Sequence, residues 1–127
     1  MPQPKPALLL IAHGSRRAEA NADLEAIAEQ FRAMPHYDFV QTSFLELAEP
    51  NIATGGQACA QAGAKYVVMV PYFLSPGVHV KDDLTEARDA LTEQFPDVRF
   101  VLAQPIGRHP LIMEIVQDRV AEALRSE

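Results

Sequence analysis

The chain has 127 residues, of which 48% are hydrophobic and 22% are charged, and its formal net charge is −6. This size and hydrophobic content suffice for one domain with its own core. Nucleic-acid binding is not expected, because the net charge is negative and no Lys/Arg-rich run could form the basic surface that contacts phosphates. No segment approaches the roughly 20 apolar residues of a membrane span. We therefore expect one soluble domain over residues 1–127, with residues 1–6 as a flexible N-terminal extension.

The only cysteine, Cys59, excludes an intramolecular disulfide. It lies between two alanines in a stretch with helical character, which is typical of small-residue packing. The lack of disulfides fits a reducing compartment. The first apolar run is too short for a secretory signal, so we expect a cytoplasmic protein.

The first half of the chain predicts two strand–helix units. Ala7–Ala12 is apolar throughout, which is typical of a strand buried on both faces. A helix is predicted at about Ala18–Ala33, because its apolar residues form a stripe at helical spacing. That stripe consists of Leu24, Ile27, Ala28 and Phe31. Phe39–Leu45 is rich in aromatic and β-branched residues and predicts a strand. The next helix is expected to carry Pro50 in its first turn and to end near Ala62, before Gly63.

The second half repeats the pattern. Tyr66–Val70 predicts a third apolar strand, and a Pro/Gly-rich loop over residues 71–77 follows it. Helices are predicted at about Val80–Gln94 and Pro110–Arg125, with a strand at Val98–Ala103 between them. The inward positions of the first of these helices are Leu84, Ala87 and Leu91. In the last helix, apolar residues at i+4 spacing are Ile112, Val116 and Val120.

Alternation of apolar strands with helices indicates the α/β class. We expect a single doubly wound, parallel, four-stranded sheet flanked by helices. Ligands of such sheets bind beyond the carboxyl ends of the strands. The polar residues that follow each strand are therefore the candidates for function.

Two histidines and one glutamate stand out at this edge. His13 follows the first strand, Glu46 ends the second, and His79 follows the third. Each also has a structural interpretation: either imidazole can orient a turn or bond a helix end, and Glu46 can be a solvated strand end. His109 is better explained as a cap of the last helix, and His36 lies in a turn.

Two imidazoles and one carboxylate favour Co²⁺, Ni²⁺, Fe²⁺ or Zn²⁺ over Mg²⁺ or Ca²⁺. A thiolate-rich zinc site is excluded because there is no second cysteine. The sequence contains no HExxH, GxGxxG, GxxxxGK[ST] or GxSxG motif, which removes the usual signatures of zincins, nucleotide-binding folds and α/β-hydrolases.

Several segments together resemble the CbiX-type sirohydrochlorin chelatases, and they occur in order along nearly the whole chain. The long segment after the third strand is the most specific. The segments are Ala12–Arg16, Phe44–Glu46 with Pro50, Val70–Val80 with Asp82 and Asp83, and Pro105–Gly107 with His109 and Pro110.

The resemblance implies a flavodoxin-like sheet of the class II chelatase kind and an ATP-independent activity. The substrates would be sirohydrochlorin and a divalent metal, Co²⁺, Fe²⁺ or Ni²⁺, with no obligatory cofactor. The product would lead to cobalamin, to siroheme or to a nickel cofactor. The family's metal-binding histidines fall on His13 and His79, and its acidic partner falls on Glu46. Longer relatives have two such domains, so the resemblance to the short form implies a homodimer.

Sirohydrochlorin is a polycarboxylate, so an acidic protein must meet it with local cations. The candidates at the predicted edge are Arg16, Arg17, Lys81 and Arg108. Ser15 lies where helix N–H groups can bind an anion. Tyr72 and Phe73 are candidates for an apolar wall against the ring, or equally for core or dimer interface.

Two other functions stay open at this point. A carrier of metal or tetrapyrrole would use the same histidines but would not turn over. A phosphate-handling enzyme of the histidine-phosphatase kind is less favoured, because such enzymes need an arginine before the histidine and this chain has Ala12 there.

Overall fold

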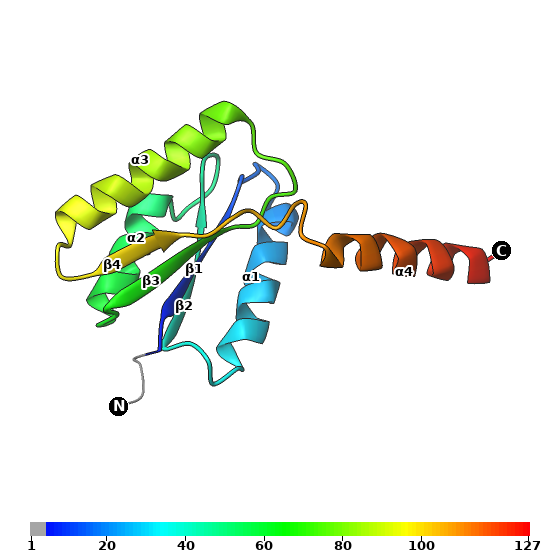
Figure 1. Cartoon of the computed structure of the whole chain (residues 1–127), viewed down its shortest axis with the longest axis horizontal. Coiled ribbons are helices and arrows are strands. Elements are labelled where there is room, and N and C mark those ends of the chain that lie inside the picture. Colours follow the sequence, from blue (N-terminus) through cyan, green and yellow to red (C-terminus); the bar gives the residue numbers. More distant parts are fainter. Residues whose placement is uncertain (1–4) are drawn as a thin grey trace.

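The fold is a parallel sheet with its strands in the order β2–β1–β3–β4, seen in a computed structural model that describes residues 5–127 (Figure 1). The strands are β1 (Ala7–Ala12), β2 (Phe39–Phe44), β3 (Tyr66–Pro71) and β4 (Arg99–Leu102). The helices are α1 (Ala18–Arg32), α2 (Ile52–Gln61), α3 (Val78–Gln94) and α4 (Leu111–Arg125). The predicted α/β class and four-stranded parallel sheet are confirmed. Of the extension expected at residues 1–6, residues 1–4 lie outside the described part.

All eight predicted elements are present, and two of the predicted helix starts are wrong. Pro50 is not in the first turn of α2: the helix begins at Ile52, and the Asn51 side chain caps it by accepting a hydrogen bond from the backbone N–H of Thr54 at 2.8 Å. The first backbone N–H groups of a helix have no partner within the helix, and an asparagine side chain can accept a hydrogen bond from one of them, whereas a proline side chain has no acceptor. Helix α3 begins at Val78, two residues earlier than expected, so His79 lies within its first turn.

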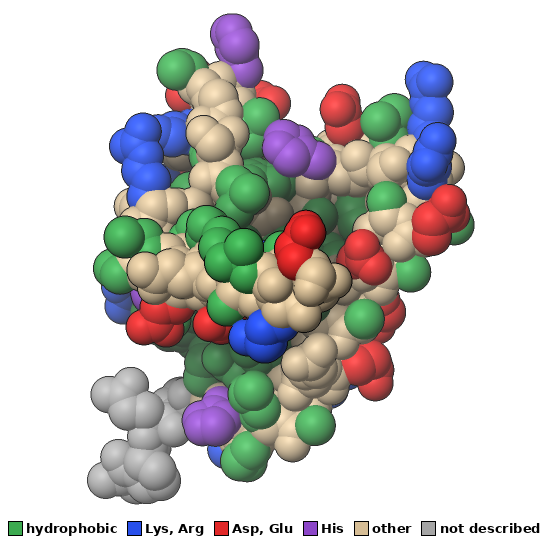
Figure 2. All heavy atoms as spheres, turned by 90° about the vertical axis from the view of Figure 1, so that its right-hand side faces the viewer, with side chains coloured by type: hydrophobic (Ala, Val, Ile, Leu, Met, Phe, Trp, Pro, Cys, Tyr) green, Lys and Arg blue, Asp and Glu red, His purple; other side chains and the backbone are tan. Residues whose placement is uncertain are grey.

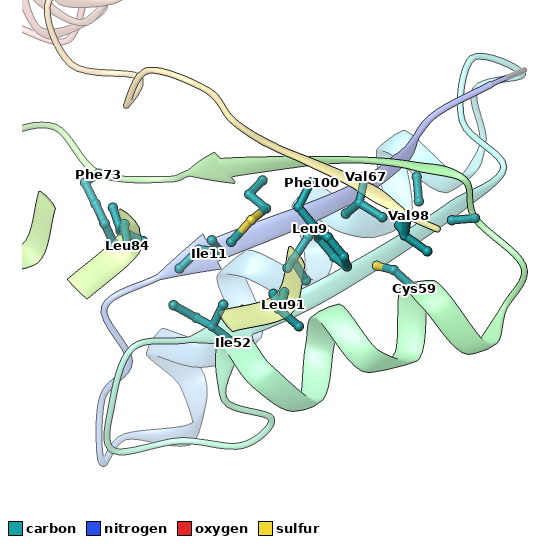
Figure 3. Packing of buried hydrophobic residues seen from close by; sticks show 13 residues of the cluster. Leu9, Ile11, Ile52, Cys59, Val67, Phe73, Leu84, Leu91, Val98 and Phe100 are labelled. Atoms are coloured by element: carbon teal, nitrogen blue, oxygen red, sulfur yellow. The ribbon is translucent and has the colours of Figure 1, made fainter. Parts of the chain in front are cut away.

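The core has two layers because the strands of the sheet are apolar on both faces. On one face, α2 and α3 pack against side chains such as Leu9, Val67 and Met69 (Figure 3). On the other face, α1 packs against Leu8 and Leu10. Figure 3 also shows Cys59 of α2 inside the first layer, which confirms its predicted packing role.

Helix α4 differs from the flanking helix that the alternating pattern predicts. None of its residues is buried, and Figure 1 shows it extending away from the sheet. The connection after β4 carries the chain off the carboxyl edge instead of back along a face of the sheet. Within residues 5–127, no helix combines the length and hydrophobicity that crossing a membrane requires.

Candidate functional site at the carboxyl edge

The loops that follow β1 and β2 are joined by their backbones. The N–H of Leu45 donates to the carbonyl of Ala12 at 3.0 Å, and the N–H of Glu46 donates to the carbonyl of His13 at 3.1 Å. These bonds continue the parallel ladder beyond the ends of the two strands. As a result His13 and Glu46, far apart in sequence, sit opposite each other at the edge of the sheet.

The ring of His13 rests on the ring of Phe73. The two ring centroids are 4.3 Å apart and the planes are inclined by 33°. Phe73 is only 4% exposed, whereas His13 is exposed to solvent. The structure therefore places Phe73 in the core, beneath a histidine, rather than at an open wall. An aromatic ring in this position restricts the orientation of the imidazole.

His13 and Glu46 line one open cavity of about 310 Å³ between α2 and α3. Asp83 of α3 lines the same cavity. The other residues at its wall are Leu45, Asn51, Ile52, Ala53, Val80 and Ala87. A wall of one imidazole, two carboxylates and several aliphatic side chains offers both ligands for a cation and apolar contacts for a ring.

His79 does not line this cavity, but it lies one helical turn before Asp83 on the same face of α3. It is exposed, as is Glu46. Among residues 5–127, no three His, Cys, Asp or Glu side chains are gathered closely enough to hold a metal ion. The structure thus brings His13 and Glu46 together and leaves His79 at the margin.

A side-chain clamp holds the loop between His13 and α1. The amide of Asn21 donates to the carbonyl of Ser15 at 2.8 Å and accepts from the N–H of Ser15 at 2.9 Å. The hydroxyl of Ser15 in turn accepts from the N–H of Arg17 at 3.0 Å. Ser15 is therefore committed to loop structure, while Arg16 and Arg17 are exposed beside it.

A second cavity, of about 400 Å³, lies beside the loops that follow β3 and β4. It contains the predicted cations Lys81 and Arg108, both exposed, and His109. The imidazole Nδ1 of His109 accepts a hydrogen bond from the N–H of Leu111 at 3.1 Å, which fits the predicted capping role. Figure 2 views the molecule from the right-hand side of Figure 1 and shows a hollow with histidine, acidic and apolar side chains around it, whereas, among residues 5–127, the wall of the second cavity includes no acidic residue. Tyr72 is 38% exposed, and neither cavity includes it in its wall.

Two shifted pKa values belong to structural groups outside this edge. Burial raises the pKa of the Cys59 thiol to about 12, so this thiol is not a nucleophile at neutral pH. The pKa of Arg32 is raised by its hydrogen bond to Glu25 and also by its contact with Glu29. The same guanidinium bonds the carbonyl of Val40 and fastens α1 to β2.

Sequence reasoning alone does not assign Asp83 and Asn51 to the site. The favourable position of Asp83 in the first turns of a helix is sufficient to explain it, and nothing in the pattern singles out Asn51. The available signal for Asp83 is its i+4 spacing from His79, which puts both on one helix face. No comparable signal exists for Asn51, because its place at the cavity depends on how the loop after β2 folds back.

Comparison with known proteins shows which family the chain resembles over most of its length. The family model described as CbiX matches residues 7–123. The chain is 35% identical to the chloroplastic sirohydrochlorin ferrochelatase of Arabidopsis thaliana over 92% of its own length and 52% of the relative. It is 34% identical to the sirohydrochlorin cobaltochelatase of Methanopyrus kandleri, over 95% of this chain and 99% of that one.

A solved structure shares the fold. The sirohydrochlorin chelatase SirB from Bacillus subtilis subspecies spizizenii, in complex with cobalt, superposes with a TM-score of 0.83 at 33% identity. The match covers 93% of this chain and 50% of that one. The chain thus spans about half the length of the Arabidopsis and Bacillus proteins and nearly all of the Methanopyrus protein. From the family match over residues 7–123, the chain belongs to the CbiX family.

Proposed function

We propose that this protein inserts a divalent metal ion into sirohydrochlorin, with Co²⁺ as the first candidate and Fe²⁺ or Ni²⁺ as alternatives. The observation that carries the proposal is the pairing of His13 and Glu46 at one open cavity on the carboxyl edge of the sheet. The named activities of the Arabidopsis, Methanopyrus and Bacillus relatives support it. The product would enter cobalamin or siroheme biosynthesis.

An incomplete ligand set suits a metal that is a substrate. His13 and Glu46 offer one nitrogen and one carboxylate from the cavity wall, and Asp83 lies on the same wall. We propose that His79 adds its imidazole from the margin. A closed site with four protein ligands would retain the metal, whereas a site with open positions lets the pyrrole nitrogens replace the protein ligands one by one.

Insertion also requires the macrocycle to lose its two pyrrole N–H protons. His13 is exposed and held against Phe73, so its imidazole has a fixed direction and access to solvent. A neutral imidazole accepts a proton effectively near pH 7. Glu46, opposite His13, is the second acceptor in this proposal. In this proposal the base and the metal ligands come from the chain, and the reaction uses no nucleotide and no resident cofactor.

We propose that the carboxylates of sirohydrochlorin form ion pairs with the Lys and Arg side chains at the carboxyl edge of the sheet. Lys81 and Arg108 line the second cavity, while Arg16 and Arg17 lie at the start of α1. Ser15 contributes backbone structure through its clamp with Asn21. We propose that the chain works in the cytoplasm as a homodimer; the free, buried thiol of Cys59 supports a reducing compartment.

An anaerobic assay tests the proposal. Sirohydrochlorin in excess over the protein is mixed with Co²⁺, Fe²⁺ or Ni²⁺, and metal insertion is followed by absorbance against buffer alone. We expect many equivalents of product per chain with at least one metal. Stoichiometric binding without turnover would identify a carrier, and no acceleration with any of the three metals would refute the chelatase function.

The cations of the second cavity are expected to act on substrate binding. The double variant Lys81→Ala/Arg108→Ala should raise KM for sirohydrochlorin about tenfold or more while kcat changes little, because uniform binding is lost. The control is Arg88→Ala/Arg119→Ala, which removes two cations from α3 and α4 outside this cavity. Equal KM values in both double variants would contradict the assignment.

A further inference from the structure

The wall of the second cavity carries positive charge with no negative charge to balance it. Lys81 of α3 and Arg108 of the loop after β4 both line the cavity, and both are exposed. Among residues 5–127, this wall contains no Asp or Glu, and the ion pairs of the chain involve other cations. In a protein of net charge −6, such a local excess of positive charge is suited to an anion.

The loop that brings Arg108 and His109 to this wall is fixed in place by its backbone. The N–H of Gly107 donates to the carbonyl of Phe73 at 3.1 Å. A Cβ at position 107 would lie 1.4 Å from the carbonyl oxygen of Leu74, so the loops after β3 and β4 are in direct contact. Arg108 has a φ of +67°, which a non-glycine residue adopts only where its surroundings enforce it. The wall is therefore shaped before any ligand binds.

His109 has one ring nitrogen that is used and one that is available. Its Nδ1 accepts a hydrogen bond from the N–H of Leu111 at 3.1 Å, so in the neutral imidazole the proton is on Nε2. The two nitrogens point to opposite sides of the ring, and Nε2 therefore faces away from the backbone of α4. No hydrogen bond within residues 5–127 uses this nitrogen. His109 is thus a donor of fixed direction on the wall that also holds Lys81 and Arg108.

We propose that His109 is a substrate-binding residue, whose Nε2–H donates a hydrogen bond to one carboxylate of sirohydrochlorin. Lys81 and Arg108 supply the charge that attracts the carboxylate to this cavity. A flexible cation accepts an anion over a range of positions, whereas an N–H of fixed direction bonds an oxygen at one position only. His109 therefore determines how the macrocycle is oriented at the edge. The inference rests on the proposed function, because it assumes that sirohydrochlorin binds at this edge.

The second cavity is well placed for such a contact. Val80 and Asp83 of α3 line the cavity that holds His13 and Glu46. Lys81, next to Val80 in the same helix, lines the second cavity. The start of α3 thus lies between the proposed metal ligands and the proposed carboxylate site. The pyrrole nitrogens lie at the centre of the macrocycle and its carboxylates at the rim, so one molecule has groups for both cavities.

Two substitutions separate this role from the capping of α4. His109→Asn keeps an acceptor near the position of Nδ1, because asparagine side chains bond the backbone N–H two residues on, but it removes the donor at Nε2. His109→Gln places an amide N–H near the position of Nε2 and removes the cap. His109 is exposed, so neither change disturbs the core.

The measurement is the Kd of metal-free sirohydrochlorin, followed anaerobically through the absorbance of the pigment. We expect His109→Asn to raise the Kd about fivefold or more, since a hydrogen bond to a charged group is lost. His109→Gln should stay within about twofold of the wild type. Amide exchange of Leu111 reports the cap, and it should be faster in His109→Gln than in His109→Asn. The control is His36→Asn, which changes an exposed histidine in the turn before β2 and should bind as the wild type does.

The other outcomes each overturn the inference. A wild-type Kd for His109→Asn would show that the donor contributes nothing, and a loss confined to His109→Gln would show a capping role alone. Equal losses in both variants would show that the imidazole is needed for something other than donation. Turnover measured in parallel separates this inference from the proposed function. A wild type that binds sirohydrochlorin but inserts no metal refutes the chelatase, while the Kd values of the variants still decide the role of His109.

Discussion

Replacing His13 with alanine is expected to lower kcat/KM for metal insertion into sirohydrochlorin at least about 100-fold. The substitution removes a metal ligand and the proposed proton acceptor at the same position, and general-base catalysis alone typically contributes 10²–10⁴-fold. Since the ring of His13 lies on the buried ring of Phe73 and is itself exposed, its removal leaves the core intact. The measurement is the initial rate of Co²⁺ insertion, corrected for the rate in buffer.

Two matched variants make this result specific. His36→Ala removes an exposed histidine that lies in the turn before β2 and should leave the rate unchanged. Glu46→Gln keeps the shape of the side chain but removes its charge, so it should slow insertion about tenfold or more. A His13→Ala variant with the wild-type rate would refute a role of His13 in the reaction. His79→Ala reports whether the marginal histidine reaches the metal, because it should then lower the rate as His13→Ala does.

The strands and most helix positions could be predicted because they depend on local pattern. An apolar run such as Ala7–Ala12 fits only a strand that is buried on both faces. The apolar residues of α1 all lie on one side of the helix, which shows that this side is packed. The strand order and the ends of α2 and α3 depend on more distant contacts. The start of α2 is an example: Asn51 can cap this helix only because the loop after β2 folds back and pairs Asn51 with Phe44.

The candidate site shows the same division. Parallel strands put His13 and Glu46 at one edge, and the sequence pattern is sufficient to infer that. The burial of Phe73 under His13 depends on the path of the loop after β3, which periodicity does not determine. The outward course of α4 is similar: its stripe is visible in the sequence, but a stripe indicates only that a partner surface exists, and not whether that surface belongs to the same chain.

Gly14→Ala is expected to lower the free energy of unfolding by about 3 kcal/mol or more, which corresponds to a fall in Tm of about 10 °C. Gly14 has a φ of +96°, which alanine adopts only with strain. A Cβ at this position would also lie 1.8 Å from the carbonyl oxygen of Glu46, far inside contact distance. The loop after β1 must therefore move away from the loop after β2.

Gly63→Ala separates the two causes, because Gly63 has almost the same φ, +94°, and no atom lies within 4 Å of the position that a Cβ would take there. We expect this variant to lose only about 1 kcal/mol, the cost of backbone strain alone. The excess in Gly14→Ala measures how tightly the His13 and Glu46 loops are pressed together. Equal losses of stability in thermal unfolding would contradict that packing. The Gly14→Ala protein should also lose metal insertion, whereas Gly63→Ala should keep it, because the opposed positions of His13 and Glu46 depend on this contact.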